Sequence, residues 1–180
     1  MQATNSMRKL HRLLRYDWPL HFVLLLTNWL PDNVVFIRLR GILARPFFKK
    51  CGNRLGIGRN VVFYNPSRIE IGDLVYIAYG CWFSSSEQII IENEVLFGPY
   101  VVVATSNHTR IQGSFRFGLP IGKSVQFKMG SWIGTNTTVL HGSTIGKGSV
   151  VGANSIVSGE VPDNCVFAGN PGYVRKELHD

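Results

Sequence analysis

The sequence predicts an all-β solenoid with a helical N-terminal segment and a short C-terminal helix. Bulky apolar residues recur every six positions over most of the chain. From Leu55 onward the apolar residues are mostly Val, Ile and Phe, with frequent glycine, which favours strands over helix. The net charge of +8 lies entirely in residues 1–54, so that segment differs in kind from the neutral remainder. A chain of 180 residues is long enough for one domain with a core and a small appendage.

The six-residue period is clearest in the C-terminal third. The bulky positions there are Phe127, Ile133, Val139, Ile145, Val151 and Val157. A small residue stands two places before each of the last five: Ser131, Thr137, Ser143, Ser149 and Ser155. Earlier runs with the same step are Ile57 and Phe63, then Ile71, Ile77 and Phe83, then Ile91, Phe97 and Val103, with a slip of two residues between runs. This period indicates short parallel strands joined by tight corners, since it matches neither an alternating strand nor a helix. An ordinary β-sandwich, the alternative, does not explain the common phase.

The period is lost between Val103 and Phe127. Residues 104–126 are polar, contain glycine and are too irregular for another coil, so we expect a long loop leaving a rigid solenoid. His108 lies near the start of this loop. Imidazole is suited to general-base catalysis, although a solvated loop histidine is the alternative. His141, within the repeat, is expected to be an outward-pointing coil residue.

The repeat, the loop histidine and the segment around Trp132 together resemble the hexapeptide-repeat acyltransferases, in particular the galactoside, maltose and exopolysaccharide O-acetyltransferases. The resemblance covers residues 55–160, with an active-site loop at 104–126. In residues 161–180, the stretch VPDNCVFAGNPGYVRKEL resembles the family's closing turn and basic C-terminal helix. The resemblance implies a left-handed parallel β-helix, a homotrimer, and acetyl-CoA as acyl donor without a metal.

The resemblance also implies roles for particular residues. His108 matches the catalytic histidine and would act as general base. Because no serine or cysteine stands beside it as a nucleophile, direct transfer is simpler than a covalent intermediate. The residues implied to bind coenzyme A are Trp132, Thr135, Ala153, Ser158 and Lys176. Gly159 and Tyr173 stand where relatives often carry Lys and Arg, so phosphate contacts are expected to be sparser.

The acceptor is less defined. The substrate-binding candidates are Ala78, Tyr79 and Ser86. Ala78 and Ser86 stand where the galactoside enzymes carry Asn and Asp, which argues against a galactoside. Tyr79, with Trp82 and Tyr100, is outward by parity and could stack on a sugar or line a subunit seam.

These residues predict an acetyl-CoA-dependent O-acetyltransferase acting on a sugar of a surface polysaccharide or a lipid-linked glycan precursor. An N-acetyltransferase for an amino sugar, or an antibiotic-modifying enzyme, is the alternative within the class. Outside it, a β-helix carbonic anhydrase would need three zinc-binding histidines, and only His108 and His141 lie in the coils or their loop. An ice-binding solenoid would need a flat threonine array, which Thr135, Thr137 and Thr138 do not make.

The N-terminal segment, residues 1–54, is basic and strongly apolar. Residues 30–50 predict a helix beginning at Pro31, with Asp32 near its positive end and the apolar residues Val35, Leu39 and Ile42 on one face. The apolar stretch at 18–30 runs 13 residues, whereas a spanning helix needs ~20. Two interpretations stay open, a cap on the first coil and attachment to an anionic membrane.

Other partners and compartments are less favoured. Nucleic acid is not expected, because the basic residues have no recognisable binding module around them. Three cysteines without metal spacing, and no recognisable secretory signal, favour a reducing cytoplasm, with peripheral contact at the cytoplasmic face of the membrane as the further possibility.

Overall fold

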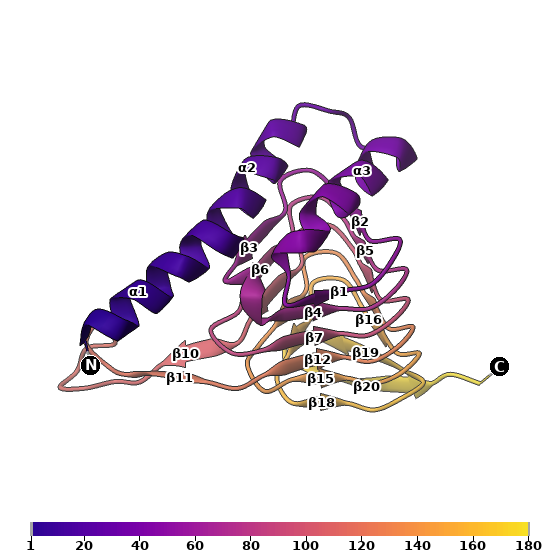
Figure 1. Ribbon diagram of the computed structural model, residues 1–180. Coiled ribbons are helices and arrows are strands. Elements are labelled where there is room, and N and C mark those ends of the chain that lie inside the picture. Colours follow the sequence, from indigo (N-terminus) through magenta and orange to yellow (C-terminus); the bar gives the residue numbers. More distant parts are fainter. Residues whose placement is uncertain (1, 180) are drawn as a thin grey trace.

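The computed structural model describes residues 2–179 and shows a parallel β-solenoid that widens at one end into a helical layer (Figure 1). The chain visits three sheets in turn, named here faces A, B and C. Face A contains β1 (Lys50–Cys51), β4 (Ile69–Ile71), β7 (Ile89–Ile91), β12 (Val125–Phe127), β15 (Thr144–Ile145) and β18 (Glu160–Val161). Face C contains β3 (Val62–Tyr64), β6 (Trp82–Ser84), β9 (Val102–Ala104), β14 (Thr138–Val139) and β17 (Ile156–Val157).

Face B is the sheet that continues to the C-terminal end. It contains β2 (Gly56–Ile57), β5 (Tyr76–Ile77), β8 (Leu96–Phe97), β13 (Trp132–Ile133), β16 (Val150–Val151), β19 (Cys165–Gly169) and β20 (Gly172–Glu177). Every pairing within the faces is parallel except that of β19 with β20. The predicted all-β solenoid is therefore confirmed, and its parallel coils agree with the left-handed β-helix expected of hexapeptide repeats.

The six-residue period is the packing period of the core. The bulky positions from Phe127 to Val157 are all buried, and so are the small residues two places before them. Two of those small residues bond the corners: the hydroxyl of Ser149 donates to the Pro162 carbonyl and that of Ser155 to the Gly152 carbonyl, both at 2.6 Å. A small side chain at these places lets neighbouring coils approach within hydrogen-bonding distance.

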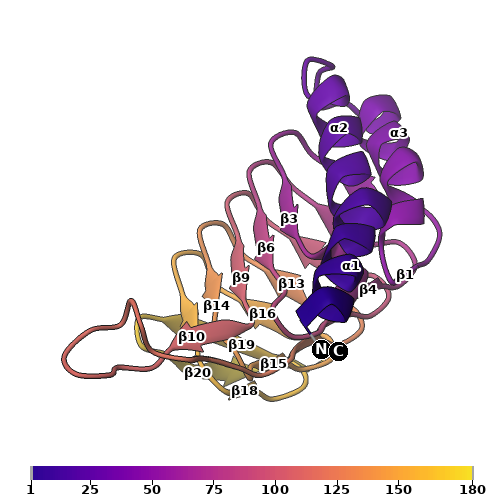
Figure 2. The ribbon, with the colours of Figure 1, turned by 60° about the vertical axis from the view of Figure 1, so that its left-hand side comes forward.

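The slips in the period all fall at one corner, where the chain passes from face C to face A. The first contains the short helix η3 (Pro66–Arg68) and the second contains residues 85–88. The third is residues 105–124, where β10 (Ser106–His108) pairs antiparallel with β11 (Pro120–Gly122). The expected irregular loop is thus partly ordered as a β-hairpin, which extends away from the solenoid (Figure 2).

The predicted C-terminal helix is wrong. The chain turns back after Gly169, which has a φ of +117°, and β20 pairs antiparallel with β19. Tyr173 and Val174 favour extended structure, and β20 covers the edge of face B that the last coil would otherwise leave open. Pairing with that edge satisfies backbone groups that a separate helix would leave exposed.

The N-terminal segment is helical, as expected, but its detail differs from the prediction. The helix α1 (Gln2–Arg12) continues through the π-helical turn η1 (Leu13–Asp17) into α2 (Trp18–Thr27), and α3 (Val34–Ala44) follows. A short 3-10 turn, η2 (Arg45–Phe47), leads into β1. The helix α3 begins after Asn33, not at Pro31, because the Asn33 side chain accepts a hydrogen bond from the Phe36 amide at 3.1 Å.

The apolar face of α3 points away from the solenoid. Val35 is 70% exposed and Ile42 is 67% exposed, whereas Arg40, Gly41 and Ala44 are buried. Gly41 is needed here, since a Cβ at this position would lie 1.9 Å from the Leu55 carbonyl oxygen. The helix therefore packs its small residues on the first coil and leaves its large ones in solvent.

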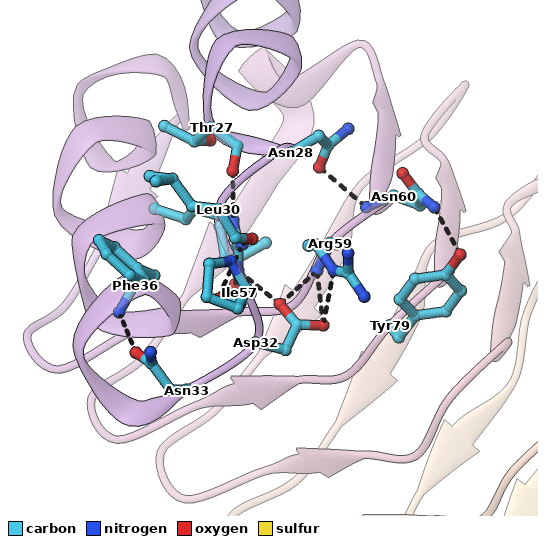
Figure 3. A network of polar contacts seen from close by, with 12 residues as sticks. Thr27, Asn28, Leu30, Asp32, Asn33, Phe36, Ile57, Arg59, Asn60 and Tyr79 are labelled. Carbon is cyan, nitrogen blue, oxygen red and sulfur yellow. Dashed lines mark hydrogen bonds and ion pairs between the residues drawn. The ribbon is translucent and has the colours of Figure 1, made fainter.

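Arg40 fastens the helical layer to the solenoid through a polar network that includes Thr27, Asp32 and Ile57, which Figure 3 shows. Its side chain is fully buried and contacts the Asp32 carboxylate at 2.7 Å. It also donates to the carbonyls of Thr27 at 3.3 Å, Leu30 at 2.5 Å and Ile57 at 3.2 Å. One guanidinium thus joins the end of α2, the connection to α3 and strand β2.

Within residues 2–179, no helix has both the length and the apolar character needed to cross a bilayer. The same residues contain no group of three or more His, Cys, Asp or Glu side chains arranged to hold a metal ion.

Candidate active site

His108 is the last residue of β10, close to the root of the hairpin. Its side chain is exposed, and its amide donates to the Asn107 side-chain oxygen at 2.8 Å. Thr105 holds the root: it is fully buried, its hydroxyl donates to the Ser84 carbonyl at 3.0 Å, and its oxygen accepts from the Glu87 amide at 2.9 Å. The imidazole therefore stands on a strand whose base is fixed to the preceding coil.

Ser86, a predicted acceptor-binding residue, lies at the same corner as His108. Its hydroxyl is 3.2 Å from that of Ser106. Because side chains alternate along a strand, Ser106 and His108 lie on the same side of β10. The contact between the Ser86 and Ser106 hydroxyls therefore shows on which side of β10 the His108 side chain lies.

A groove of about 840 Å³ runs between the N-terminal helices and the corner where face C meets face A. Trp18 and His21 of α2 line one wall, and Tyr64, Arg68 and Ser86 line the other. The groove combines aromatic surface with hydroxyl and cationic groups, the mixture that suits a sugar. The groove could not be predicted from the sequence, because its two walls are 40 or more residues apart in the chain and meet only when the helices pack.

Arg12 and Asp17 present unsatisfied polar atoms in this groove. Their side chains form an ion pair with Nε and Oδ2 3.4 Å apart. Both atoms are shielded from solvent, and neither has a hydrogen-bond partner among the described residues. The other carboxylate oxygen of Asp17 accepts from the Asn65 amide at 3.1 Å, which fixes its position. Because the two atoms face each other, the Arg12–Asp17 pair is a fixed polar part of the groove wall.

The residues predicted to bind coenzyme A lie mainly on face B and its border with face C. Trp132 is in register with Val150, Val150 with Val166, and Val166 with Lys176. Three inter-strand spacings separate Trp132 from Lys176, so the two residues lie ~14 Å apart along this row. An exposed indole and an ammonium group thus share one outward row of the sheet.

Thr135 and Ala153 occupy the same corner in consecutive coils. The Asn154 amide donates to the Thr135 carbonyl at 2.9 Å, and a Cβ on Gly134 would lie 2.6 Å from the Ala153 nitrogen. The two residues therefore stack one above the other at this corner, with Thr135 half-buried and Ala153 exposed. Ser158 is exposed and follows β17, so it lies at a different corner, between faces C and A.

Arg175 is a residue that the sequence reasoning missed. A bulge between Val166 and Phe167 shifts the pairing of β19 with β20, and Arg175 stands opposite that bulge, next to Lys176. Its guanidinium lies 3.7 Å from the centre of the Tyr173 ring and donates to the Ala168 carbonyl at 3.1 Å. Arg175 therefore places a cation over the Tyr173 ring, beside Lys176 on β20.

Ala78 and Tyr79 lie at the corner between faces B and C. Ala78 is buried and its amide donates to the Phe97 carbonyl at 3.0 Å, so its methyl group has little surface for an acceptor. The Tyr79 hydroxyl accepts from the Asn60 side chain at 2.6 Å, and its ring packs edge-on against Tyr100. Packing within this column of side chains accounts for Tyr79 without a ligand.

The predicted residues thus lie at three places on one chain. Ser158 shares the corner of His108 and Ser86, and the corner between faces B and C holds Ala78, Tyr79, Thr135 and Ala153. His108 and Ser86 lie where face C meets face A, whereas Trp132 and Lys176 lie on face B. In a solenoid with three faces, that corner is opposite face B. One chain therefore does not bring the imidazole to the predicted coenzyme A surface.

The cysteines are not placed as nucleophiles. Burial raises the pKa of Cys81 to about 11, and its thiol donates to the Gly98 carbonyl at 3.1 Å. Burial also raises the pKa of Cys51 to about 11, an effect that nearby Arg45 opposes. Both thiols are protonated near neutral pH, which removes the reactive thiolate.

Comparison with known proteins agrees with this architecture. Residues 125–159 match the family model described as bacterial transferase hexapeptide, six repeats. Galactoside O-acetyltransferase of Lactococcus lactis subsp. lactis (strain IL1403) is 32% identical over 75% of this chain, which spans 59% of that relative. Galactoside O-acetyltransferase of Escherichia coli (strain K12) is 31% identical over 80% of this chain and 71% of the relative. WbbJ of the same strain, named for O-acetyl transfer in lipopolysaccharide biosynthesis, is 34% identical over 74% of this chain and 69% of that relative.

Solved structures extend the likeness over the helical segment. A maltose O-acetyltransferase from Clostridium difficile 630 superposes with a TM-score of 0.79 at 27% identity, covering 93% of this chain and 89% of that one. A hexapeptide-repeat acetyltransferase from Vibrio cholerae O1 biovar eltor, complexed with acetyl-coenzyme A, superposes with a TM-score of 0.80 at 26% identity. The superposition covers 91% of this chain and 87% of that one.

The parallel solenoid of hexapeptide repeats, together with these relatives, defines the class of the protein. The chain belongs to the hexapeptide-repeat acetyltransferases. The predicted family and the assignment to the acyltransferases are confirmed.

Proposed function

We propose that this protein transfers an acetyl group from acetyl-CoA to a sugar hydroxyl of a surface polysaccharide or a lipid-linked glycan precursor. The observation that carries the proposal is the position of His108, on a fixed strand beside the Ser86 contact and at the corner that borders the groove. The relative named for lipopolysaccharide biosynthesis supports a polysaccharide acceptor. All three cysteines are free thiols, which suits a reducing cytoplasm.

In the proposed mechanism the His108 imidazole acts as general base. It accepts the proton of the sugar hydroxyl as the oxygen attacks the thioester carbonyl, which forms a C–O bond. The C–S bond then breaks, and the proton passes from the imidazolium to the departing thiolate. Such proton transfer typically contributes ~10²–10⁴-fold to the rate. No covalent acyl-enzyme is needed, consistent with the buried thiols of Cys51 and Cys81.

The groove is the proposed acceptor site. Trp18 and Tyr64 offer aromatic surface to a pyranose ring, while Arg68 and Ser86 offer polar partners to its hydroxyls, beside the Arg12–Asp17 ion pair. Arg12 and Asp17 were not among the sequence predictions.

The proposed donor site is the row on face B. The indole of Trp132 would lie along acetyl-CoA, the backbones of Thr135 and Ala153 would contact its pantetheine arm, and Lys176 would approach a phosphate. Arg175 is proposed as a second cation for the phosphates, because it lies beside Lys176 on β20.

Since one chain places His108 and face B on opposite sides, the complete site is proposed to form between two copies. The corner that carries His108 would face the Trp132 row of the next chain. A closed ring of three copies would make three identical sites, which supports the predicted homotrimer.

The test is a release assay for free coenzyme A with acetyl-CoA and a panel of neutral glycans, amino sugars and lipid-linked glycans. His108→Ala should lower transfer at least ~100-fold with unchanged thermal stability. His11→Ala, an exposed helix histidine outside the groove, is the matched control and should retain the parent rate. Near-parent turnover in His108→Ala, with coenzyme A binding intact, would refute the role of the imidazole. A rate confined to amino sugars would favour N-acetylation.

A further inference from the structure

The long N-terminal helix carries an apolar stripe on its outer side. The stripe comprises Leu10, Leu14, Phe22, Leu25, Leu26 and Trp29, all exposed. The spacings of four, eight and three residues from Leu10 to Leu25 place the helical members along one side, and Trp29 follows in the turn after α2. A different side of the same helix, with Leu20, Leu24 and Thr27, is buried against the solenoid. The stripe is therefore additional to what capping the first coil requires.

The helix α3 extends this exposed apolar surface. Val34 is 76% exposed and Val35 is 70% exposed, while Trp29, just before the connection to α3, is 79% exposed. Helices α2 and α3 lie side by side at the same end of the molecule (Figure 1, Figure 2). Exposed apolar side chains gathered on two adjacent helices mark an interaction site on a folded protein.

Cations accompany the apolar surface, and the nearby carboxylates are already neutralised. Residues 1–54 contain ten Lys and Arg against two acidic residues, Asp17 and Asp32. Asp17 pairs with Arg12, and Asp32 pairs with the buried Arg40. In the described part of the chain, no carboxylate lies within ion-pair distance of the exposed Arg8, Lys9 or Arg54, three of the remaining cations.

We propose that this surface, formed by the apolar stripe together with Val34 and Val35, docks on an anionic lipid bilayer. The helices would lie in the plane of the interface with their apolar side chains among the acyl chains and their cations at the headgroups. A second copy is the less suitable occupant, because it would bring a second set of the same positive charges to the same face. Since no described helix can span, the attachment is peripheral. It does not depend on the reaction proposed above.

Vesicle co-sedimentation of the full chain tests the proposal. The parent should bind vesicles of equimolar phosphatidylcholine and phosphatidylglycerol more tightly than pure phosphatidylcholine, and the difference should shrink with salt. Arg8→Gln/Lys9→Gln should weaken anionic binding by roughly 30-fold at low salt, from about fivefold per cation. Lys147→Gln, an exposed lysine on the solenoid, is the control and should leave binding unchanged.

The contribution of the apolar side chains to vesicle binding is tested by replacing them with glutamine, with an exposed valine elsewhere as the control. Trp29→Gln/Val35→Gln should lower partitioning at least ~10-fold into either vesicle type. Val174→Gln, 43% exposed on β20 at the other end of the solenoid, should not. Acetyl transfer to a water-soluble acceptor should stay at the parent rate in all variants, which separates this test from the test of His108.

Three results would overturn the proposal. The first is a parent that does not distinguish anionic from neutral vesicles. The second is parent-like binding by both double variants. The third is a parent that binds no vesicles, combined with a Trp29→Gln/Val35→Gln variant whose molar mass by light scattering differs from that of the parent. This result would assign the surface to contacts between copies.

Discussion

Replacing Arg40 with methionine should detach the helical layer from the first coil. The arginine is fully buried, and the change removes its ion pair with Asp32 together with hydrogen bonds to the carbonyls of Thr27, Leu30 and Ile57. Removing one partner of a buried pair typically costs about 3–5 kcal/mol. The Asp32 side chain is partly exposed and also accepts hydrogen bonds from the Arg59 amide at 3.1 and 3.2 Å, so we expect the lower end, ~3 kcal/mol.

The assay is urea unfolding together with limited proteolysis across residues 28–33. Arg40→Met should lower the unfolding midpoint and speed cleavage there, because this connection loses its anchor. It should also raise the KM for the acceptor and leave that for acetyl-CoA unchanged, since α2 forms one wall of the groove. Arg45→Met is the control: this exposed arginine donates to the Cys51 carbonyl at 3.1 Å and the Asn53 side chain at 3.0 Å, and its loss should cost under ~1 kcal/mol. Equal stability of the two variants would refute the anchoring role.

Two further predictions concern assembly and the thiols. Light scattering should give three times the chain mass. Inactive His108→Ala and Trp132→Ala chains, refolded together in equal amounts, should recover roughly a quarter of the parent activity, because one seam in four would pair an intact His108 corner with an intact Trp132 row. No recovery of activity would place both residues in one chain's site. Cys81 should react slowly with a thiol reagent at pH 8, and fast labelling of the folded chain at that pH would contradict this. The buried thiol should stabilise the fold below its ordinary pKa of 9.0, and that contribution should be lost as the pH rises toward its folded pKa of about 11.

The solenoid was predictable because its core repeats locally. Each coil buries residues six positions apart, so Phe127, Ile133 and Val139 show their inward direction in the sequence itself. The terminal elements depend on partners far away in the chain. The segment at 172–177 becomes a strand because the edge of β19 is available to it, and that edge is not visible in its own residues.

The sequence did not show which face of α3 is buried, for a related reason. A pattern of Val35, Leu39 and Ile42 normally marks the buried side of a helix. Here the close approach to the first coil requires the small side of the helix, with Gly41 against the Leu55 carbonyl. The apolar face is left to solvent, and it is this reversal that exposes the proposed lipid-binding surface.

The candidate site was predictable only in part, because its residues depend on different kinds of information. The break in the period located His108 directly. The division of the site between two sides of the chain follows from which face each residue occupies, and that requires the full topology. The groove could not be foreseen, because Trp18 and Tyr64 meet only once Arg40 has fixed the helices.

One helix takes part in both proposals, and its geometry connects them. In α2, His21 lines the groove while its neighbour Phe22 belongs to the exposed stripe. Consecutive residues of a helix point about 100° apart, so a bilayer that holds Phe22 would lie beside the groove without filling it. An acceptor sugar carried on a lipid could then reach the corner that bears His108 while its anchor stays in the membrane.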